Sequence, residues 1–468
     1  MSIRYTDRMG DSDALLWNNE RDPMLRSTIV SLMLLDRAPD DARLDRAIER
    51  SLARIPRLRH RVALDPLRAA PPRWEADPHF DLDYHVRRVA VAGSGSLRDL
   101  LDLAEPIGMQ AFDKDRPLWE LYRIGGLEGG RTAILIKLHH SISDGVGLVR
   151  MTSSLVERAR EPDPERERRR PSLLDEDPAS SLGPFAETLQ ALRYRAGVNM
   201  DWTTRAAGTL SRGARGLLRD PAGTLRSAAR ISQSIAKALR PVSEPMSPLM
   251  RGRSLAVHYE VLELSLEELK RPAKVVGGTL NDAFVAAVTG GLRLYHEHHG
   301  HPVPELRMTM PVNLREGESG DRAGNQFAPA RFAVAVDVAD PAERMRRIGQ
   351  TVRAERSEPA LPLTETVAGV VARLPQALSV NLFGSMLKAI DFVTSNVPGP
   401  PFPVYASGAR VERMFGFGPL SGAAANVTLF SYDGSVNIAI NTDRAAVPDG
   451  GFLAECVAKG AGEVLSLA

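Results

Sequence analysis

Residues 131–147 read Arg-Thr-Ala-Ile-Leu-Ile-Lys-Leu-His-His-Ser-Ile-Ser-Asp-Gly-Val-Gly, and this stretch is the strongest indication of the fold. Residues 133–138 are apolar except for Lys137, which is typical of a buried strand. The strand leads directly into His139 and His140. Beyond the following turn, apolar residues recur at helical spacing; they are Leu148, Met151 and Leu155. The stretch therefore predicts a strand that carries two imidazoles to its end, then a turn and a helix.

The two histidines are candidates for different roles. Neighbouring residues on a regular strand point to opposite faces, so His139 and His140 cannot both face one pocket. A neutral imidazole can take a proton from an alcohol and return it to a leaving group. Asp144 lies close enough through the turn to brace the loop, and Gly145 permits a backbone geometry that a Cβ would hinder. Structural histidines or metal ligands would also fit, but no H-E-x-x-H helix or cysteine cluster supports zinc.

Composition indicates a globular protein of two domains. The chain has 468 residues, of which 43% are hydrophobic and 25% charged. A net charge of +2 gives no general affinity for nucleic acid. The single cysteine, Cys456, excludes an internal disulfide and fits a reducing compartment. Neither a signal peptide nor a run of roughly 20 apolar residues is present, so we expect a cytoplasmic protein that does not span a bilayer.

The first block of the chain, up to about residue 160, alternates predicted strands with predicted helices. This alternation indicates an α/β domain. Besides the histidine strand, the predicted strands cover residues 29–35, 84–91 and 119–124. One helix begins at Asp40-Asp41, with Leu44, Ile48 and Leu52 on one face, and another covers residues 97–104.

The middle of the chain is charged and then basic. Residues 157–182 mix both signs of charge and predict a solvated linker. Residues 185–239 are helical in pattern and rich in arginine, with leucine and isoleucine interspersed. Such helices could lie on the inner face of an anionic membrane or on a lipid inclusion, or could form a crossover packed on the protein. We therefore divide the chain into residues 1–160, 161–250 and 251–468.

The last block again mixes helices and strands. Strands are predicted over residues 257–261, 306–312 and 332–338. Ser265 with Glu268 predicts a capping box, Asn281-Asp282 opens a helix, and Asp340-Pro341 starts another. Asp433-Gly434 between two apolar strands predicts a hairpin with a type I′ turn.

Several short segments resemble one family of acyltransferases. Residues 139–145 match the H-H-x-x-x-D-G signature of enzymes that resemble chloramphenicol acetyltransferase. In order along the chain, further segments are similar to the bacterial wax ester synthase/diacylglycerol acyltransferases: Pro117-Leu118-Trp119, Asn281-Asp282, Pro311-Val312-Asn313-Leu314-Arg315, Gly324-Asn325, Ser395-Asn396-Val397-Pro398-Gly399-Pro400, Asn426 to Gly434, Asp443-Arg444 and Pro448-Asp449. The N-terminal segment keeps Asp13, Pro23 and Met24 but lacks the usual M-H-V-G continuation, which leaves the substrate preference open.

The resemblance implies a fold and a reaction. The fold is α/β, with two chloramphenicol-acetyltransferase-like domains, a central channel between them and a helical crossover linker. The reaction is acyl transfer from acyl-CoA to a long-chain alcohol or a diacylglycerol, giving wax ester or triacylglycerol. Acyl-CoA is a co-substrate, and no cofactor, metal or nucleic acid is expected. Two alternatives remain: a catalytically degenerate protein that binds lipid or acyl-CoA, and a condensation-type enzyme that uses carrier-bound acyl groups.

The resemblance also implies roles for particular residues. His140 is the expected general base, and His139 supports it or the acceptor pocket. Asn281 is the expected oxyanion donor, although an N-cap role fits its position equally well. Asp144 is expected to hold its loop through an arginine. The expected channel-shaping residues are Gly145, Pro117, Leu118, Trp119, Asp282, Ser395 and Asn396, the last two in a turn over residues 395–400.

Overall fold

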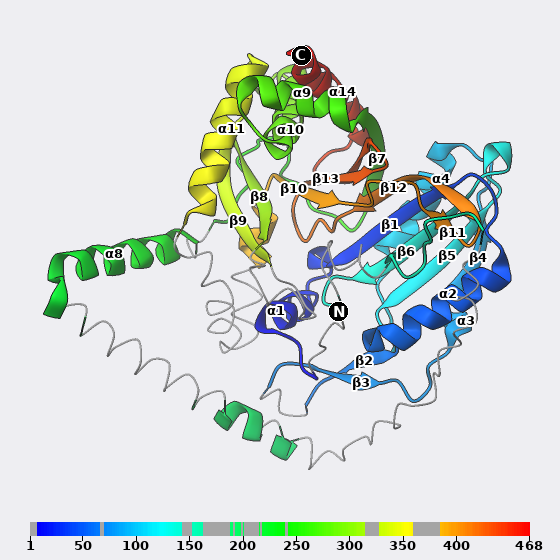
Figure 1. Ribbon diagram of the computed structural model, residues 1–468. Coiled ribbons are helices and arrows are strands. Elements are labelled where there is room, and N and C mark those ends of the chain that lie inside the picture. The colour runs from blue at the N-terminus through cyan, green and yellow to red at the C-terminus, as the bar shows by residue number, and fades with distance from the viewer. Residues whose placement is uncertain are drawn as a thin grey trace.

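The chain forms two α/β lobes, each built on one six-stranded sheet (Figure 1). This computed structural model describes residues 7–65, 70–142, 152–161, 188–190, 192–197, 200, 215, 218–238, 242–313, 327–358 and 384–468. The helices are α1 (Asp11–Asn19), α2 (Asp41–Arg54), α3 (Leu82–His85), α4 (Leu97–Met109), α8 (Pro221–Ala238), α9 (Leu266–Val276), α10 (Leu280–His298), α11 (Pro341–Arg356) and α14 (Gly450–Leu465). Short 3-10 turns cover Pro23–Leu25, Pro56–Leu58 and Glu128–Gly130.

The strands complete the two lobes and one small hairpin. They are β1 (Thr28–Leu35), β2 (His60–Ala63), β3 (Arg73–Ala76), β4 (Val86–Ala90), β5 (Trp119–Gly125), β6 (Thr132–His139), β7 (Val257–Ser265), β8 (Glu305–Asn313), β9 (Phe327–Ala335), β10 (Phe392–Pro398), β11 (Tyr405–Ala406), β12 (Ala409–Phe417), β13 (Ala425–Tyr432) and β14 (Ser435–Asp443). The mixed α/β fold of both lobes confirms the predicted fold class.

The N-terminal sheet has the order β11-β12-β1-β6-β5-β4, with β1 and β6 antiparallel at its centre. Helix α2 covers one face and begins where predicted, since the Asp40 carboxylate accepts a hydrogen bond from the Arg43 N–H at 2.8 Å. Its apolar side chains Leu44, Ile48 and Leu52 are buried against that face. Helix α4 and part of the C-terminal lobe pack on the other face. The histidine strand is therefore enclosed on both sides, as its apolar run predicted.

The strand predicted over residues 84–91 is wrong at its start. Residues Leu82–His85 form α3, which Asp81 caps by accepting a hydrogen bond from the Asp83 N–H, and β4 starts only at Val86. The turn of α3 buries His85, whose ring stacks on Trp119 with the centroids 4.7 Å apart. Its Nδ1 also lies 2.7 Å from the Trp119 carbonyl oxygen. A tertiary contact to β5 thus overrides the local strand pattern.

The C-terminal sheet has the order β7-β14-β13-β10-β8-β9. Helices α9, α10, α11 and α14 pack together on it, and α10 lies so close to α14 that a Cβ at Gly291 would meet the Val457 Cα at 2.5 Å. The predicted hairpin is present: Asp433 and Gly434 both have positive φ, 44° and 82°, as a type I′ turn requires. The predicted turn over residues 395–400 is wrong, because residues 395–398 continue β10 and pair in parallel with β13.

One segment of the C-terminal part belongs to the N-terminal sheet. Strand β12 pairs antiparallel with β1, so that Val30 lies opposite Phe417 and Leu32 opposite Phe415. Strand β11 extends the same sheet beyond β12. A boundary at residue 251 does not predict that β11 and β12 join the N-terminal sheet. The alternation of side chains in a strand does not reveal which sheet the strand joins.

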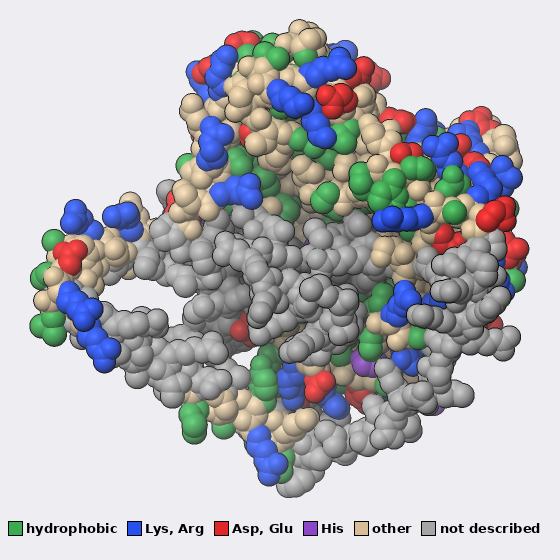
Figure 2. Space-filling model, viewed as in Figure 1, with side chains coloured by type: hydrophobic (Ala, Val, Ile, Leu, Met, Phe, Trp, Pro, Cys, Tyr) green, Lys and Arg blue, Asp and Glu red, His purple; other side chains and the backbone are tan. Residues whose placement is uncertain are grey.

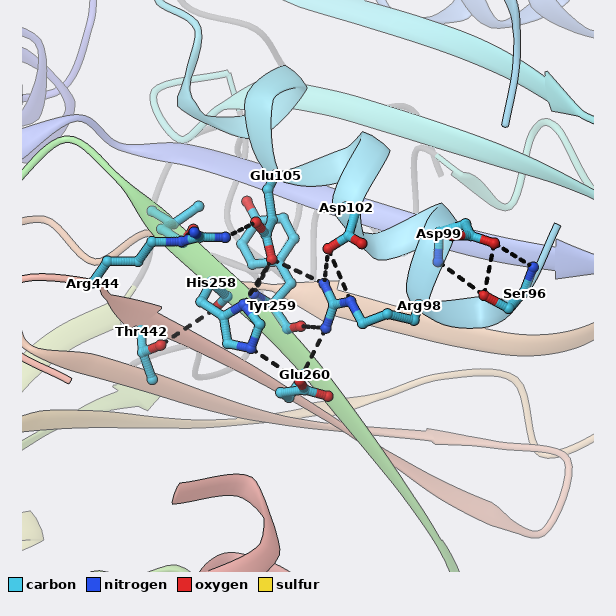
Figure 3. A network of polar contacts seen from close by, with 11 residues as sticks. Ser96, Arg98, Asp99, Asp102, Glu105, His258, Tyr259, Glu260, Thr442 and Arg444 are labelled. Atoms are coloured by element: carbon cyan, nitrogen blue, oxygen red, sulfur yellow. Dashed lines mark hydrogen bonds and ion pairs between the residues drawn. The ribbon is translucent and has the colours of Figure 1, made fainter. Parts of the chain in front are cut away.

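A polar network joins the lobes where α4 lies along β7 (Figure 3). The buried Glu105 carboxylate accepts hydrogen bonds from Arg98 at 3.0 Å, from the Tyr259 N–H at 2.9 Å and from Arg444 at 2.6 Å. His258 adds a contact from its Nδ1 at 3.0 Å. The Tyr259 ring enters the apolar cluster of the N-terminal lobe and stacks on Phe417 at 4.1 Å. The contact between α4 and β7 therefore holds the two lobes together through buried polar and aromatic contacts.

The crossover between the lobes is described in part. Glu157 pairs with Arg43 at 2.6 Å and Arg160 with Asp36 at 2.7 Å, so the predicted linker over residues 157–182 is wrong for its first residues. The remainder of that run, and the helix predicted after the histidines, lie outside the described residues.

Helix α8 falls within the predicted basic helical region and extends away from both lobes (Figure 1). No single helix in the described ranges is long and apolar enough to cross a membrane; α9 and α10 reach that size only together, with a bend of 97°.

Candidate active site

His139 is the last residue of β6 and is completely buried. The Ser141 N–H donates to its Nδ1 at 3.1 Å, and the Ser141 Oγ lies 2.7 Å from the same nitrogen. A ring nitrogen that accepts from a backbone N–H carries no proton, so the proton of the neutral ring is assigned to Nε2. Nε2 lies 2.9 Å from Glu20 Oε1. Both nitrogens of His139 are therefore engaged, and its tautomer is fixed.

Glu20 links His139 to the backbone that carries His140. Its Oε1 accepts a second hydrogen bond, from the Ser27 N–H at 2.8 Å, and the Ser27 carbonyl accepts one from the His140 N–H at 2.8 Å. Lys114 Nζ lies 3.5 Å from Oε2. Burial works against the charged carboxylate, but His139, the Ser27 amide and Lys114 outweigh it and lower the pKa of Glu20 to about 2. The buried acid is thus an anion at neutral pH.

Two aromatic rings pack against the His139 imidazole. Trp17 and Phe112 meet it edge-on, with ring centroids 5.9 and 6.2 Å away. Lys114 lies over the Trp17 ring at 4.4 Å, and Lys137 lies over the Phe112 ring at 4.5 Å. These contacts restrict the imidazole to one orientation and exclude water from the Glu20 pair.

Lys137 is a second buried charge on the same face of β6. Its side chain is fully buried, its Nζ lies 3.5 Å from Glu120 Oε2, and burial lowers the pKa of its ammonium. Glu120 also accepts a hydrogen bond from the Tyr122 hydroxyl at 2.6 Å. Glu120 lies opposite Lys137 on the neighbouring strand, and its carboxylate allows a lysine to be buried in this apolar strand.

His140 follows β6 and is partly buried. Its N–H continues the pairing with the segment before β1. If the alternation of β6 continued one residue beyond its end, His140 would lie on the face opposite His139, the face that Leu138 and α2 share. Both nitrogens of His139 already have partners, so this imidazole does not itself suit proton transfer.

The Pro117-Leu118-Trp119 segment lies beside the end of β6. All three residues are buried, and the Leu118 carbonyl accepts a hydrogen bond from the His139 N–H at 3.0 Å. Trp119 lies opposite Leu138 in the sheet and donates from its Nε1 to the Leu58 carbonyl at 2.7 Å. The segment therefore supports the strand that carries the histidines. Asp144 and Gly145, on the far side of the histidines, lie outside the described residues.

Asn281 and Asp282 lie in the first turn of α10. The N-cap interpretation of Asn281 is wrong, because Thr279 caps the helix and Asp282 completes the capping box, with the Thr279 N–H donating to Asp282 at 2.8 Å. The Asn281 Nδ2 instead faces Met310 Sδ at 3.6 Å. Contacts within the described ranges join neither residue to His139 or His140. Ser395 is partly buried and Asn396 exposed, both on β10.

Three residues of this site were missed in the sequence: Glu20, Ser141 and the partnered Lys137. Glu20 stands between Asp13 and Pro23, within the N-terminal segment that resembles the family, but the pattern of that segment indicates no role for it. Lys137 was visible as the one charge in an apolar run, and such a residue needs a buried partner. Among the described residues, no group of His, Cys, Asp or Glu is placed to hold a metal ion.

Comparisons with known proteins show the family. Residues 9–284 match the family model of the wax ester synthase/diacylglycerol acyltransferase catalytic domain, and residues 323–463 match the C-terminal domain of the same family. The chain belongs to the wax ester synthase/diacylglycerol acyltransferase family. The family assignment made from the motifs is therefore confirmed, and the protein is an acyltransferase.

Two relatives support this family membership, and two solved structures share the fold. A candidate diacylglycerol O-acyltransferase of Mycobacterium tuberculosis is 37% identical over 483 aligned positions, covering 100% of this chain and 93% of the relative. Another, from Mycobacterium bovis, is 31% identical and covers 80% of this chain and 79% of the relative. The family enzyme of Marinobacter aquaeolei shares the fold, with a TM-score of 0.64, 21% identity and 98% coverage of both chains. A condensation domain of the calcium-dependent antibiotic synthetase also shares it, with a TM-score of 0.61, 18% identity and 98% and 95% coverage.

Proposed function

We propose that this family member transfers an acyl group from acyl-CoA to a diacylglycerol or a long-chain alcohol, with His140 as the general base. His140 takes the hydroxyl proton, and the oxygen attacks the thioester carbon to form a tetrahedral oxyanion. Collapse of that intermediate forms the ester and releases the CoA thiolate, which takes the proton from His140. The observation that carries the assignment is the Glu20–His139–Ser141 arrangement. It gives both ring nitrogens of His139 a partner, and through Ser27 it also holds the backbone N–H of His140.

Other residues assist this chemistry in the proposal. Asn281 donates to the oxyanion; its amide faces a thioether sulfur, a weak acceptor that competes little for the donor. Asp144 and Gly145 shape the loop after His140, while Pro117, Leu118 and Trp119 hold the strand end. Asp282, Ser395 and Asn396 line the route to the site. His139, held by Glu20, positions His140 and does not itself transfer the proton.

The test replaces His140 with alanine. Purified His140→Ala should form no labelled neutral lipid from radiolabelled palmitoyl-CoA with hexadecanol or with a diacylglycerol. His79→Ala is the matched control, because His79 is an exposed imidazole and should retain wild-type turnover. Undiminished turnover of His140→Ala would defeat the base assignment. Wild-type protein that binds acyl-CoA without turnover, or that accepts only carrier-bound acyl groups, would defeat the proposed function itself.

We also propose that α8 brings the enzyme to a lipid surface, the inner membrane face or a lipid inclusion. Leu225 on this helix is 61% exposed, and Leu218, just before it, is 87% exposed. Arg219, Arg226 and Arg230 are exposed beside them, and Figure 2 shows apolar and basic side chains together at the far left, where α8 lies. Apolar insertion combined with cationic side chains suits an anionic bilayer.

Vesicle flotation tests this contact. The full chain should float with vesicles of phosphatidylglycerol and phosphatidylcholine, and salt should weaken the association. A Leu218→Asp, Leu225→Asp variant should lose it. Val275→Asp is the control, because Val275 is 68% exposed on α9, away from α8. Equal flotation of both variants would show that α8 does not bind lipid.

A further inference from the structure

A small cavity lies between α2 and the N-terminal sheet. Its lining is almost entirely hydrocarbon, and the residues that matter here are Ile48 and Leu52 from α2, Trp119 and Leu121 from β5, and Ile136 and Leu138 from β6. Ser51 also reaches it, but its hydroxyl is already bonded to the Ala47 carbonyl at 2.8 Å and to Ser154 Oγ at 2.5 Å. The cavity therefore offers an apolar surface, and apolar cavities of this kind remain dry.

The cavity is close to the proposed base. Leu138 and Trp119 form a cross-strand pair at one end of the lining, and Ile136 and Leu121 form the next pair along the strands. His140 comes two residues after Leu138, and its N–H still pairs with the Ser27 carbonyl at 2.8 Å, so strand alternation predicts that it lies on the face of the sheet that the cavity occupies. Two residues of strand span about 7 Å. The lining thus begins about 7 Å from the His140 backbone and continues away from it.

We propose that this cavity receives part of the hydrocarbon chain of a lipid substrate and so selects chain length. The chain's reacting end would lie at His140, and its following methylene groups would enter between Trp119 and Leu52. This proposal rests on the proposed acyl transfer. The cavity volume is about 40 Å³, a few times the roughly 10–15 Å³ that one water molecule needs. The cavity therefore fits a short part of a chain, and a longer insertion must displace the α2 side chains.

Either substrate could supply such a chain, the acyl group of the thioester or the alkyl group of the alcohol. The experiment therefore has two arms. In the donor arm, kcat/KM is measured for CoA thioesters from butanoyl to palmitoyl with hexadecanol held constant. In the acceptor arm, alcohols from butanol to hexadecanol are compared with palmitoyl-CoA held constant. The arm in which the chain-length profile changes identifies the chain that enters the cavity.

Two variants change the cavity in opposite directions. Leu52→Phe fills it and should lower kcat/KM for longer chains relative to the shortest chain by about tenfold or more. Ile136→Ala enlarges it and should move the preferred chain length upward. Leu453→Ala is the matched control, because it removes a buried leucine from α14 in the other lobe. Its chain-length profile should equal that of the wild type in both arms.

The outcomes are distinct. A changed profile in one arm, or in both, supports the chain site, provided that Leu453→Ala leaves the profile unchanged. Unchanged profiles for both cavity variants, or one uniform loss for every chain length, overturn it. If Leu52→Phe does not fold, as judged by circular dichroism, Ile136→Ala alone decides. Absence of turnover by the wild type with every donor instead means that the proposed function has failed.

Discussion

Glu20 is an acid that burial alone would neutralise, and its neighbours keep it charged. His139 and the Ser27 N–H reach the same carboxylate oxygen, at 2.9 and 2.8 Å. The anion in turn orients the imidazole and ties it to the segment that carries the His140 backbone. Partners of this kind usually contribute to activity by orienting the groups that react.

Replacement of Glu20 with glutamine should lower kcat/KM by roughly 10- to 100-fold. The neutral amide keeps the shape of the side chain but loses the charge that fixes the His139 tautomer. Steady-state acyl transfer measures the effect. Glu297→Gln, which weakens an exposed ion pair with Arg293 on α10, is the control and should change little. An unaltered kcat/KM in Glu20→Gln would mean that His139 needs no charged partner.

The charge of Glu20 should also appear in the pH dependence of stability. Its pKa in the folded protein is about 2, below the ordinary value of 4.5, so folding favours the ionised form. The stabilisation, roughly 3 kcal/mol, is complete above pH 4.5 and is lost as the pH falls toward 2. Urea unfolding at pH 6 and pH 3 should therefore show a smaller loss of stability for Glu20→Gln than for the wild type. Equal losses in the two proteins would contradict this assignment.

At the scale of elements, the start of α10 shows how a cap positions a candidate oxyanion donor. Thr279 and Asp282 satisfy each other's backbone N–H groups, which leaves Asn281 between them with its amide free of capping duty. Among the described helices of the C-terminal lobe, α10 has the most buried residues, and it contacts α9, α11 and α14. A substitution that removes the cap of its first turn should therefore lower stability and also move Asn281.

Thr279→Ala should lower the free energy of unfolding by about 1 kcal/mol, because the side-chain acceptor for the Asp282 N–H is lost. Thr279→Ser retains a hydroxyl and should stay close to the wild type. Urea denaturation measures both variants. If the alanine and serine variants were equally stable, the cap would contribute nothing and Asn281 would not depend on it.

At the scale of the whole molecule, two features join the lobes. Strands β11 and β12 of the C-terminal part belong to the N-terminal sheet, and the Glu105 network links α4 to β7 (Figure 3). The strand pair places Phe415 and Phe417 in the N-terminal sheet. Two arginines, one histidine and one backbone N–H surround the buried Glu105 carboxylate.

Glu105→Gln should lower the free energy of unfolding by about 2 kcal/mol, because one uncharged amide cannot satisfy Arg98, Arg444 and His258 together. The arginines are partly exposed, which limits the loss. Asp102→Asn is the matched control: Asp102 pairs with the same Arg98, but within α4 and at 57% exposure. Equal urea midpoints for the two variants would show that the joint does not depend on Glu105.

Much of the local structure followed from the sequence alone. Apolar periodicity located β1, β5, β6 and α2, the Asp40 and Asp340 caps marked the starts of α2 and α11, and Asp433-Gly434 marked the hairpin. These features depend on residues only a few positions apart, so the chain itself carries the information.

The tertiary structure alone decided which distant residues meet. It brought Glu20 to His139, Glu120 to Lys137 and β12 to the N-terminal sheet, and it turned Leu82–His85 into a helix against Trp119. A carboxylate near a chain end has many cations it could pair with, and a strand pattern fits either sheet. Only the packing of α1, α4 and the two lobes removes these alternatives, because a buried charge or strand edge is stable solely where its partner is buried with it.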